Sequence, residues 1–165
     1  MALEEVLSQA LSLNTPMVLV TGGEPLLQEN CQSLMTALCN AGKIVLLETS
    51  GERDISHVDP RVHRIVDFKA PGSGECDKNR LENIACLTNS DEVKLVLADR
   101  IDYAWAKDLI NTHQLHKRAA HVLLSAVHGE LDPKDLVEWI LQDQLPVRMQ
   151  LQLHKYIWGS QATGV

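Results

Sequence analysis

The chain has 165 residues, enough for one domain that buries about two-thirds of its unfolded surface without disulfide or metal staples. It is 45% hydrophobic and 22% charged, as is typical of globular proteins, and carries a net charge of -7. This charge and the lack of a basic patch argue against a nucleic-acid partner. No apolar run approaches the roughly 18 residues that a membrane span needs, and the acidic start has no apolar signal core. We therefore expect a cytoplasmic protein without a membrane partner.

Helices and strands are predicted to alternate along the chain. Helical periodicity or capping residues predict helices over 2–12, 27–41, 77–87, 100–114 and 132–142. Short runs rich in branched apolar residues predict strands over 17–20, 43–47, 62–68, 91–97, 120–124 and 147–153, and 156–165 is expected to be a tail. Such alternation with short connections is typical of a parallel sheet, either open and doubly wound or part of a barrel. We expect a single domain over residues 1–165.

Polar and glycine-rich loops follow four of these strands. They cover residues 21–24, 48–51, 67–74 and 125–129. Because the carboxyl ends of parallel strands lie on one rim of the sheet, these loops are expected to meet where α/β proteins bind ligands. Any single loop could be ordinary turn chemistry, but four on one rim favour a ligand site.

The loop after the first strand carries the clearest binding signal. Gly22 and Gly23 let the backbone pass close to a ligand with its N–H groups free, and Glu24 adds an acceptor suited to an ammonium group. A small anion bound at the two glycines of an unrelated α/β enzyme is the alternative interpretation.

Four cysteines, Cys31, Cys39, Cys76 and Cys86, lie far apart in the sequence. Their spacing fits neither a disulfide framework nor a close pair of metal ligands. We interpret them as small buried or half-buried thiols.

The sequence Thr-Gly-Gly-Glu-Pro at 21–25 resembles radical S-adenosylmethionine enzymes. Further segments make the chain similar to the 7-carboxy-7-deazaguanine synthase family: Glu-Thr-Ser-Gly at 48–51, Asp-Phe-Lys-Ala-Pro-Gly-Ser-Gly-Glu at 67–75, Glu-Val-Lys-Leu-Val at 92–96, Gln-Leu-His-Lys at 152–155 and Trp-Gly at 158–159. The resemblance implies a partial (βα) barrel of the radical S-adenosylmethionine type, with about five parallel strands here and flanking helices, and with the family's first strand missing.

The resemblance also implies a function. The family converts 6-carboxy-5,6,7,8-tetrahydropterin to 7-carboxy-7-deazaguanine with loss of ammonia, a carbon–nitrogen lyase reaction on the route to queuosine. It works as a homodimer and uses S-adenosylmethionine, a 4Fe-4S cluster and Mg²⁺. The implied partner is thus a small pterin substrate.

The site residues implied by the resemblance fall on the four rim loops and near the C-terminus. Those implied for S-adenosylmethionine are Gly22, Gly23, Glu24, Ser50, Asp67, Phe68, Lys69, Ser125, Ala126, Val127 and His128. Those implied for the substrate are Thr21, Gln152 and His154. No catalytic residue and no metal ligand is assigned in this chain. Lys69 and Lys94 merit attention as charges among apolar strand residues, although each could be a lysine snorkelling at a strand end.

The sequence departs from the family in one respect. The family's three cluster-binding cysteines lie in a loop ahead of the helix that here begins near Leu3, and the four cysteines present are downstream of it. We therefore expect an N-terminally incomplete chain that is inactive alone. The alternative is a non-catalytic α/β ligand-binding or interaction module derived from this fold. An exposed edge at strand 17–20 predicts oligomerisation or poor solubility.

Overall fold

The computed structural model describes residues 2–159. The helices are α1 (Leu3–Ser12), α2 (Cys31–Asn40), α3 (Arg100–His113), α4 (Leu115–Arg118), α5 (Pro133–Asp143) and α6 (Leu153–Trp158). The strands are β1 (Met17–Val20), β2 (Ile44–Thr49), β3 (His63–Asp67), β4 (Glu92–Leu97), β5 (His121–Ala126) and β6 (Arg148–Met149). Short stretches of 3-10 helix cover Pro25–Leu27, Pro71–Ser73, Cys76–Lys78 and Leu81–Cys86.

The six strands form one parallel sheet in chain order, β1 to β6. The register places Asp67 at the end of β3 beside Lys94 of β4. The expected parallel α/β partial barrel is confirmed, with six strands where the resemblance implied about five. The predicted strand 147–153 pairs over only Arg148–Met149, because Leu123 and Leu124 of β5 are its partners there and the chain then leaves the sheet.

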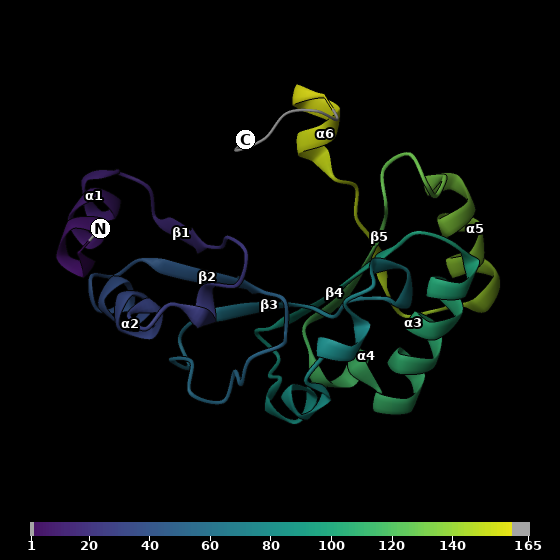
Figure 1. Ribbon diagram of the computed structural model, residues 1–165, viewed down its shortest axis with the longest axis horizontal. Coiled ribbons are helices and arrows are strands. Elements are labelled where there is room, and N and C mark those ends of the chain that lie inside the picture. Colours follow the sequence, from purple (N-terminus) through teal and green to yellow (C-terminus); the bar gives the residue numbers. More distant parts are fainter. Residues whose placement is uncertain (1, 160–165) are drawn as a thin grey trace.

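The two faces of the sheet differ in what covers them. Helices pack on one face, α2 against β2, α3 against β4, and α4 and α5 against β5. Residues pointing to that side, such as Val45, Leu47 and Leu95, are fully buried and form the core. Residues between them, such as Leu46 and Lys94, are only half-buried. Figure 1 shows the strands curving between α2 on one side and α3 on the other, with α6 standing apart from both. The half-buried face is thus the one open to a ligand.

The region 76–86 is not the helix that periodicity predicts. It consists of two 3-10 turns, Cys76–Lys78 and Leu81–Cys86, separated at Asn79. The side chain of Asn79 bonds to the backbone of Lys69, and such side-chain bonds compete with a continuous helix. A local sequence pattern contains no information about this distant partner.

Three other element boundaries differ from the prediction. The helix expected from 27 begins at Cys31, because Glu24 caps a separate 3-10 turn at Pro25. The helix expected to reach 114 ends at His113, where Gln114 takes a left-handed φ of 50° before α4 begins. The expected tail contains α6, and residues 160–165 lie outside the described residues.

Exposed apolar side chains include residues of β1 and of α6. Met17 and Leu19 are about half exposed on β1, which pairs with β2 on one side only within the described sheet. Tyr156 and Trp158 are exposed on α6. Between residues 2 and 159, no helix combines the length and the hydrophobicity that crossing a membrane requires.

Candidate functional site

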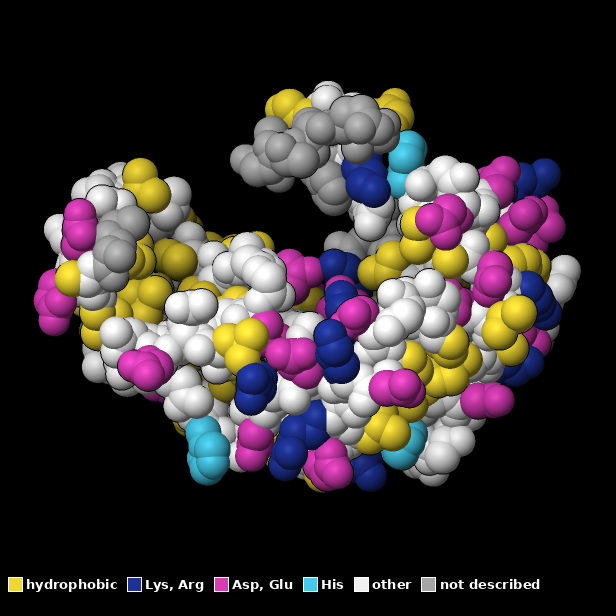
Figure 2. All heavy atoms as spheres, viewed as in Figure 1, with side chains coloured by type: hydrophobic (Ala, Val, Ile, Leu, Met, Phe, Trp, Pro, Cys, Tyr) yellow, Lys and Arg dark blue, Asp and Glu magenta, His cyan; other side chains and the backbone are white. Residues whose placement is uncertain are grey.

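Two cavities lie side by side at the carboxyl-end rim and share Lys69. The first, of about 380 Å³, is lined by Gly23, Glu24, Leu27, Ser50, Glu52, Lys69, Glu75, Lys78 and Asn79. The second, of about 440 Å³, is lined by Asp67, Phe68, Lys69, Ala70, Gly72, Ser73, Lys94, Val96, Ala98, Asp102, Val127, Glu130 and Gln152. Loops after β1, β2, β3, β4 and β5 therefore meet at one rim, as the placement of the polar loops predicts. In Figure 2 the molecule is hollowed on one side, with acidic and basic side chains at the floor of the hollow.

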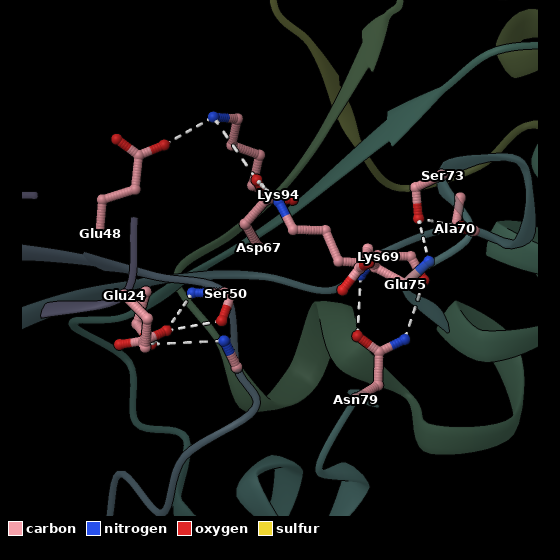
Figure 3. A network of polar contacts seen from close by, with 12 residues as sticks. Glu24, Glu48, Ser50, Asp67, Lys69, Ala70, Ser73, Glu75, Asn79 and Lys94 are labelled. Atoms are coloured by element: carbon pink, nitrogen blue, oxygen red, sulfur yellow. Dashed lines mark hydrogen bonds and ion pairs between the residues drawn. The ribbon is translucent and has the colours of Figure 1, made fainter. Parts of the chain in front are cut away.

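Glu24 ties the glycine loop to the end of β2. Its Oε2 accepts from the Thr49 hydroxyl at 2.8 Å, from the Ser50 N–H at 2.8 Å and from the Ser50 hydroxyl at 2.6 Å. Its Oε1 accepts only from the N–H of Leu26, at 2.9 Å, and so keeps one acceptor position. Burial alone would raise the pKa of Glu24, but the bonds from Ser50, Leu26 and Thr49 outweigh it and lower this pKa. Glu24 is therefore an ionised, fixed acceptor (Figure 3).

The two glycines of this loop differ in backbone conformation. Gly22 has a φ of 147°, a backbone conformation that other residues rarely adopt. Gly23 has no such φ, and a Cβ atom added there would meet nothing within 4 Å. Gly23 nevertheless lines the first cavity, so a side chain at this position would enter space that a ligand could use.

Four charged side chains form a network at the open face, which we call the rim network: Glu48, Asp67, Lys69 and Lys94. Lys94 Nζ lies 2.6 Å from Glu48 Oε1 and 3.9 Å from Asp67 Oδ2. Lys69 Nζ donates to the same Asp67 Oδ2 at 2.9 Å. Figure 3 shows Lys94 between the two carboxylates. The ion pair of Lys94 with Glu48 spans β3, because β2 and β4 lie on either side of that strand.

Asp67 has an acceptor atom without a protein donor. The side chain is buried, and its Oδ1 has no hydrogen-bond partner among the described residues. Oε1 of Gln152, which lines the same cavity, is also a buried atom without a hydrogen-bond partner among the described residues. Buried polar atoms are nearly always paired, so two open acceptors in one cavity are typical of a place for a ligand that donates hydrogen bonds.

The remaining residues predicted for S-adenosylmethionine contribute unequally. Phe68 is fully buried, with its ring close to Gly51 in the core, so it can offer a ligand mainly backbone groups. Ser125 and Ala126 are buried at the end of β5. Val127 reaches the second cavity, and its N–H bonds to the Leu97 carbonyl at 2.9 Å. His128 follows it in the half-buried to exposed loop after β5.

The residues predicted for the substrate do not share one cavity. Gln152 lines the second rim cavity. Thr21 instead lines a groove of about 460 Å³ bordered by Val6 of α1 and Cys31 of α2. His154 belongs to α6, and its side chain lies outside the described structure.

Asn79 and Asp102 were missed as rim residues from the sequence, and Glu48, although part of the predicted rim loop 48–51, was not singled out as a site residue. The alternation along β2 and β4 could have placed Glu48 on the same face as Lys94. No sequence signal was available for Asn79 and Asp102, because their partners are backbone groups of a distant loop.

The described cysteines do not fit an iron–sulfur cluster. All four are free, Cys31 buried and the others half-buried, as the spacing predicts. Burial raises the pKa of Cys31, Cys39 and Cys76, which disfavours the thiolate that a cluster requires. Within residues 2–159, no three or more His, Cys, Asp or Glu side chains are grouped to hold a metal ion.

No family model matches the sequence. Curated proteins do match it over most of its length. A 7-carboxy-7-deazaguanine synthase from Chlorobaculum tepidum is 46% identical over 168 residues, a match that covers all of this chain and 76% of the relative. The chain belongs to the 7-carboxy-7-deazaguanine synthase family. The member from Koribacter versatilis is 43% identical over 162 residues, covering 90% of this chain and 72% of that protein. The family resemblance seen in the rim motifs is thereby confirmed.

A solved structure supports the fold of this 7-carboxy-7-deazaguanine synthase family member. Streptococcus suis SuiB bound to S-adenosylmethionine matches with a TM-score of 0.61 at 11% identity. The match covers 93% of this chain and 42% of SuiB, so this chain spans less than half of that protein. At this identity the likeness concerns the arrangement of strands and helices only.

Proposed function

We propose that this chain takes part in the reaction of its family, the conversion of 6-carboxy-5,6,7,8-tetrahydropterin to 7-carboxy-7-deazaguanine with loss of ammonia. In this role it is a carbon–nitrogen lyase, and we further propose that it acts as a cytoplasmic homodimer. The observation that carries the proposal is the identity of 46% over the whole chain to a synthase of that name. The joined rim cavities are consistent with two small molecules bound next to each other.

S-adenosylmethionine fits the groups at the rim. Glu24 Oε1 keeps an acceptor position for an ammonium group, and Asp67 Oδ1 is a buried acceptor for a hydroxyl or N–H donor. Gly23, Ser50 and Lys69 line the cavity between them. Bound there, the cofactor would supply an adenosyl radical that removes one hydrogen atom from the substrate. The task of the chain is then to hold two molecules in fixed contact and away from water.

The substrate is proposed to lie on the Gln152 side of the rim. The open Oε1 of Gln152 can accept an N–H of the pterin, and Lys94 and Glu48 present opposite charges on the same face. Thr21, which lines the separate groove beside Val6 and Cys31, and His154 belong to the proposed substrate set on the strength of the family resemblance alone. The 4Fe-4S cluster and Mg²⁺ of the family find no fitting ligand group in residues 2–159, and no step is assigned to either.

Calorimetry with S-adenosylmethionine tests the proposal at its first step. We expect binding by the 165-residue chain and a clear loss of affinity in Glu24→Gln and Asp67→Asn. Inorganic phosphate serves as the comparison ligand. Binding of phosphate but not S-adenosylmethionine would contradict the proposal and favour an anion site at Gly22 and Gly23.

A non-catalytic binding module of the same fold is the second candidate. The observation in its favour is that the described cysteines are free and dispersed along the chain, and that burial raises the pKa of Cys31, Cys39 and Cys76. Anaerobic reconstitution with iron and sulfide separates the two. Iron uptake followed by reductive cleavage of S-adenosylmethionine would exclude the module, whereas ligand binding without cleavage would support it.

A further inference from the structure

The rim segment that carries Lys69 is not held by the sheet. The last residue of β3 is Asp67, and the chain then runs through the turn Pro71–Ser73. Lys69 nevertheless borders both cavities and bonds to Asp67. Something other than strand pairing must therefore fix its position.

Asn79 supplies that hold at one end of the segment. Its Oδ1 accepts from the Lys69 N–H at 2.8 Å, and its Nδ2 donates to the Lys69 carbonyl at 2.8 Å. One amide thus satisfies both backbone groups of Lys69, in the way a neighbouring strand would. Figure 3 shows the amide of Asn79 aligned with this backbone.

Asp102 supplies the hold at the other end. Its Oδ1 accepts from the Gly72 N–H at 2.7 Å, and its Oδ2 accepts from the Ala98 N–H at 2.9 Å. The carboxylate is 1% exposed and lies in the first turn of α3. It therefore joins the Gly72 turn to the turn between β4 and α3.

We propose that Asn79 and Asp102 are positioning residues for the S-adenosylmethionine site, acting through Lys69 and the backbone of residues 69–72. The two side chains hold this segment from opposite ends, so that the Lys69 ammonium meets Asp67 at the border of the two cavities. The proposal rests on the proposed function, because it assumes that S-adenosylmethionine occupies this rim. Asn79 acts through Lys69, so its effect should depend on the Lys69 side chain.

A double-mutant cycle tests this dependence. The variants are Asn79→Ala, Lys69→Met and the double variant, with S-adenosylmethionine affinity measured by calorimetry on the full chain. We expect Asn79→Ala to weaken binding about tenfold, the size of one hydrogen bond to a charged group. The double variant should bind no more weakly than Lys69→Met alone, because the two residues act as one unit. Independent, additive losses would overturn the proposal, since a merely structural Asn79 predicts them.

Asp132→Ala is the matched control. Asp132 also bonds a backbone N–H, that of Lys134 at 2.9 Å, but it caps α5. We expect it to lower the unfolding temperature without changing the affinity. If Asn79→Ala fails to fold, Asn79→Asp replaces it, because this variant keeps the acceptor for the Lys69 N–H and loses the donor to the Lys69 carbonyl.

Hydrogen exchange gives a readout that needs no ligand. The Lys69 N–H should be protected in the unmodified chain and should exchange faster in Asn79→Ala. An unprotected Lys69 N–H in the unmodified chain would show that Asn79 does not hold the Lys69 backbone. If the unmodified chain does not bind S-adenosylmethionine, the proposed function fails and the positioning role falls with it. If it binds and Asn79→Ala binds equally well, only the positioning role fails.

Discussion

Two polar networks lie at opposite ends of the same strands, and they differ in how completely their atoms are paired. Near the amino ends of β3 and β4, Asp91 accepts five bonds, three from Arg64 and two from Thr88. We call Arg64, Thr88 and Asp91 the base network. Arg64 also donates to the carbonyls of Ile55 and Cys86, and both charged residues are buried.

The rim network is less complete. Asp67 is similarly buried, yet its Oδ1 has no partner among the described residues. The side chains of Lys69 and Lys94 remain 34% and 23% exposed. A closed network stabilises the fold, whereas an open one at a cavity leaves polar atoms for a ligand. Changes at the base should therefore reduce stability, and changes at the rim should reduce binding.

The largest effect on stability is expected from Arg64→Met. The substitution removes the two side-chain donors to Asp91, keeps the backbone N–H donor, and leaves that carboxylate buried without its cation. Loss of one partner of a buried ion pair costs about 3–5 kcal/mol in the free energy of unfolding. Urea denaturation measures this change. A loss below about 1 kcal/mol, the value for surface pairs, would show that the base network does not stabilise the fold as proposed.

Gly72→Ala is expected to have an intermediate effect. A Cβ at Gly72 would lie 2.6 Å from Asp102 Oδ2, so the carboxylate or the loop must move. Forcing extra volume into a packed place costs about 1–3 kcal/mol, which thermal unfolding would report. S-adenosylmethionine affinity should fall as well. Gly23→Ala is the control for stability, because its Cβ meets nothing within 4 Å. Equal stability of the two variants would contradict the role of Asp102.

Acid should weaken the base network and the contacts of Glu24. The pKa of Glu24 is lowered below its ordinary 4.5, and that of Asp91 is lowered below 3.8. The unfolded chain then takes up protons at higher pH than the folded chain does. Stability from these carboxylates is present above their ordinary pKa values and is lost as the pH falls through the lowered values. Denaturation curves between pH 6 and about pH 3 should show this fall, and Glu24→Gln should make it shallower. An unchanged slope in that variant would contradict the lowered pKa of Glu24.

The smallest effect on stability is expected from Lys94→Met. Its ion pair with Glu48 is partly exposed, and such pairs contribute no more than about 1 kcal/mol. Substrate affinity should nevertheless fall, because Lys94 faces the second cavity. Urea denaturation together with calorimetry on the pterin would separate the two quantities. A stability loss as large as that of Arg64→Met would remove the contrast between base and rim.

Sequence reasoning predicted the sheet and the meeting of the polar loops at one rim, because both follow from local patterns. The apolar runs marked every strand, and the loops at Gly23, Ser50 and Lys69 do line one cavity. It did not predict how the rim is held together. The ion pair of Lys94 with Glu48 joins two strands that are separated by a third.

The 3-10 turns around Asn79 were misjudged for a similar reason. Residues 77–87 have a helical pattern, but the pairing of Asn79 with Lys69 overrides it. Likewise, the one acceptor position that Glu24 keeps depends on its bonds from Thr49, Ser50 and Leu26, and two of these residues lie on another strand or its loop. Tertiary partners set these details, and local propensity does not encode them.

The strand order has a consequence for how the polypeptide acquires its shape. Each strand pairs with the next one along the chain, from β1 through β6, and between residues 2 and 159 no strand is inserted between two earlier ones. A newly made strand can therefore join as soon as its predecessor is in place, which suits folding from the amino end during synthesis. Pairing between successive elements also keeps contacts local for a parallel sheet, a property associated with faster folding.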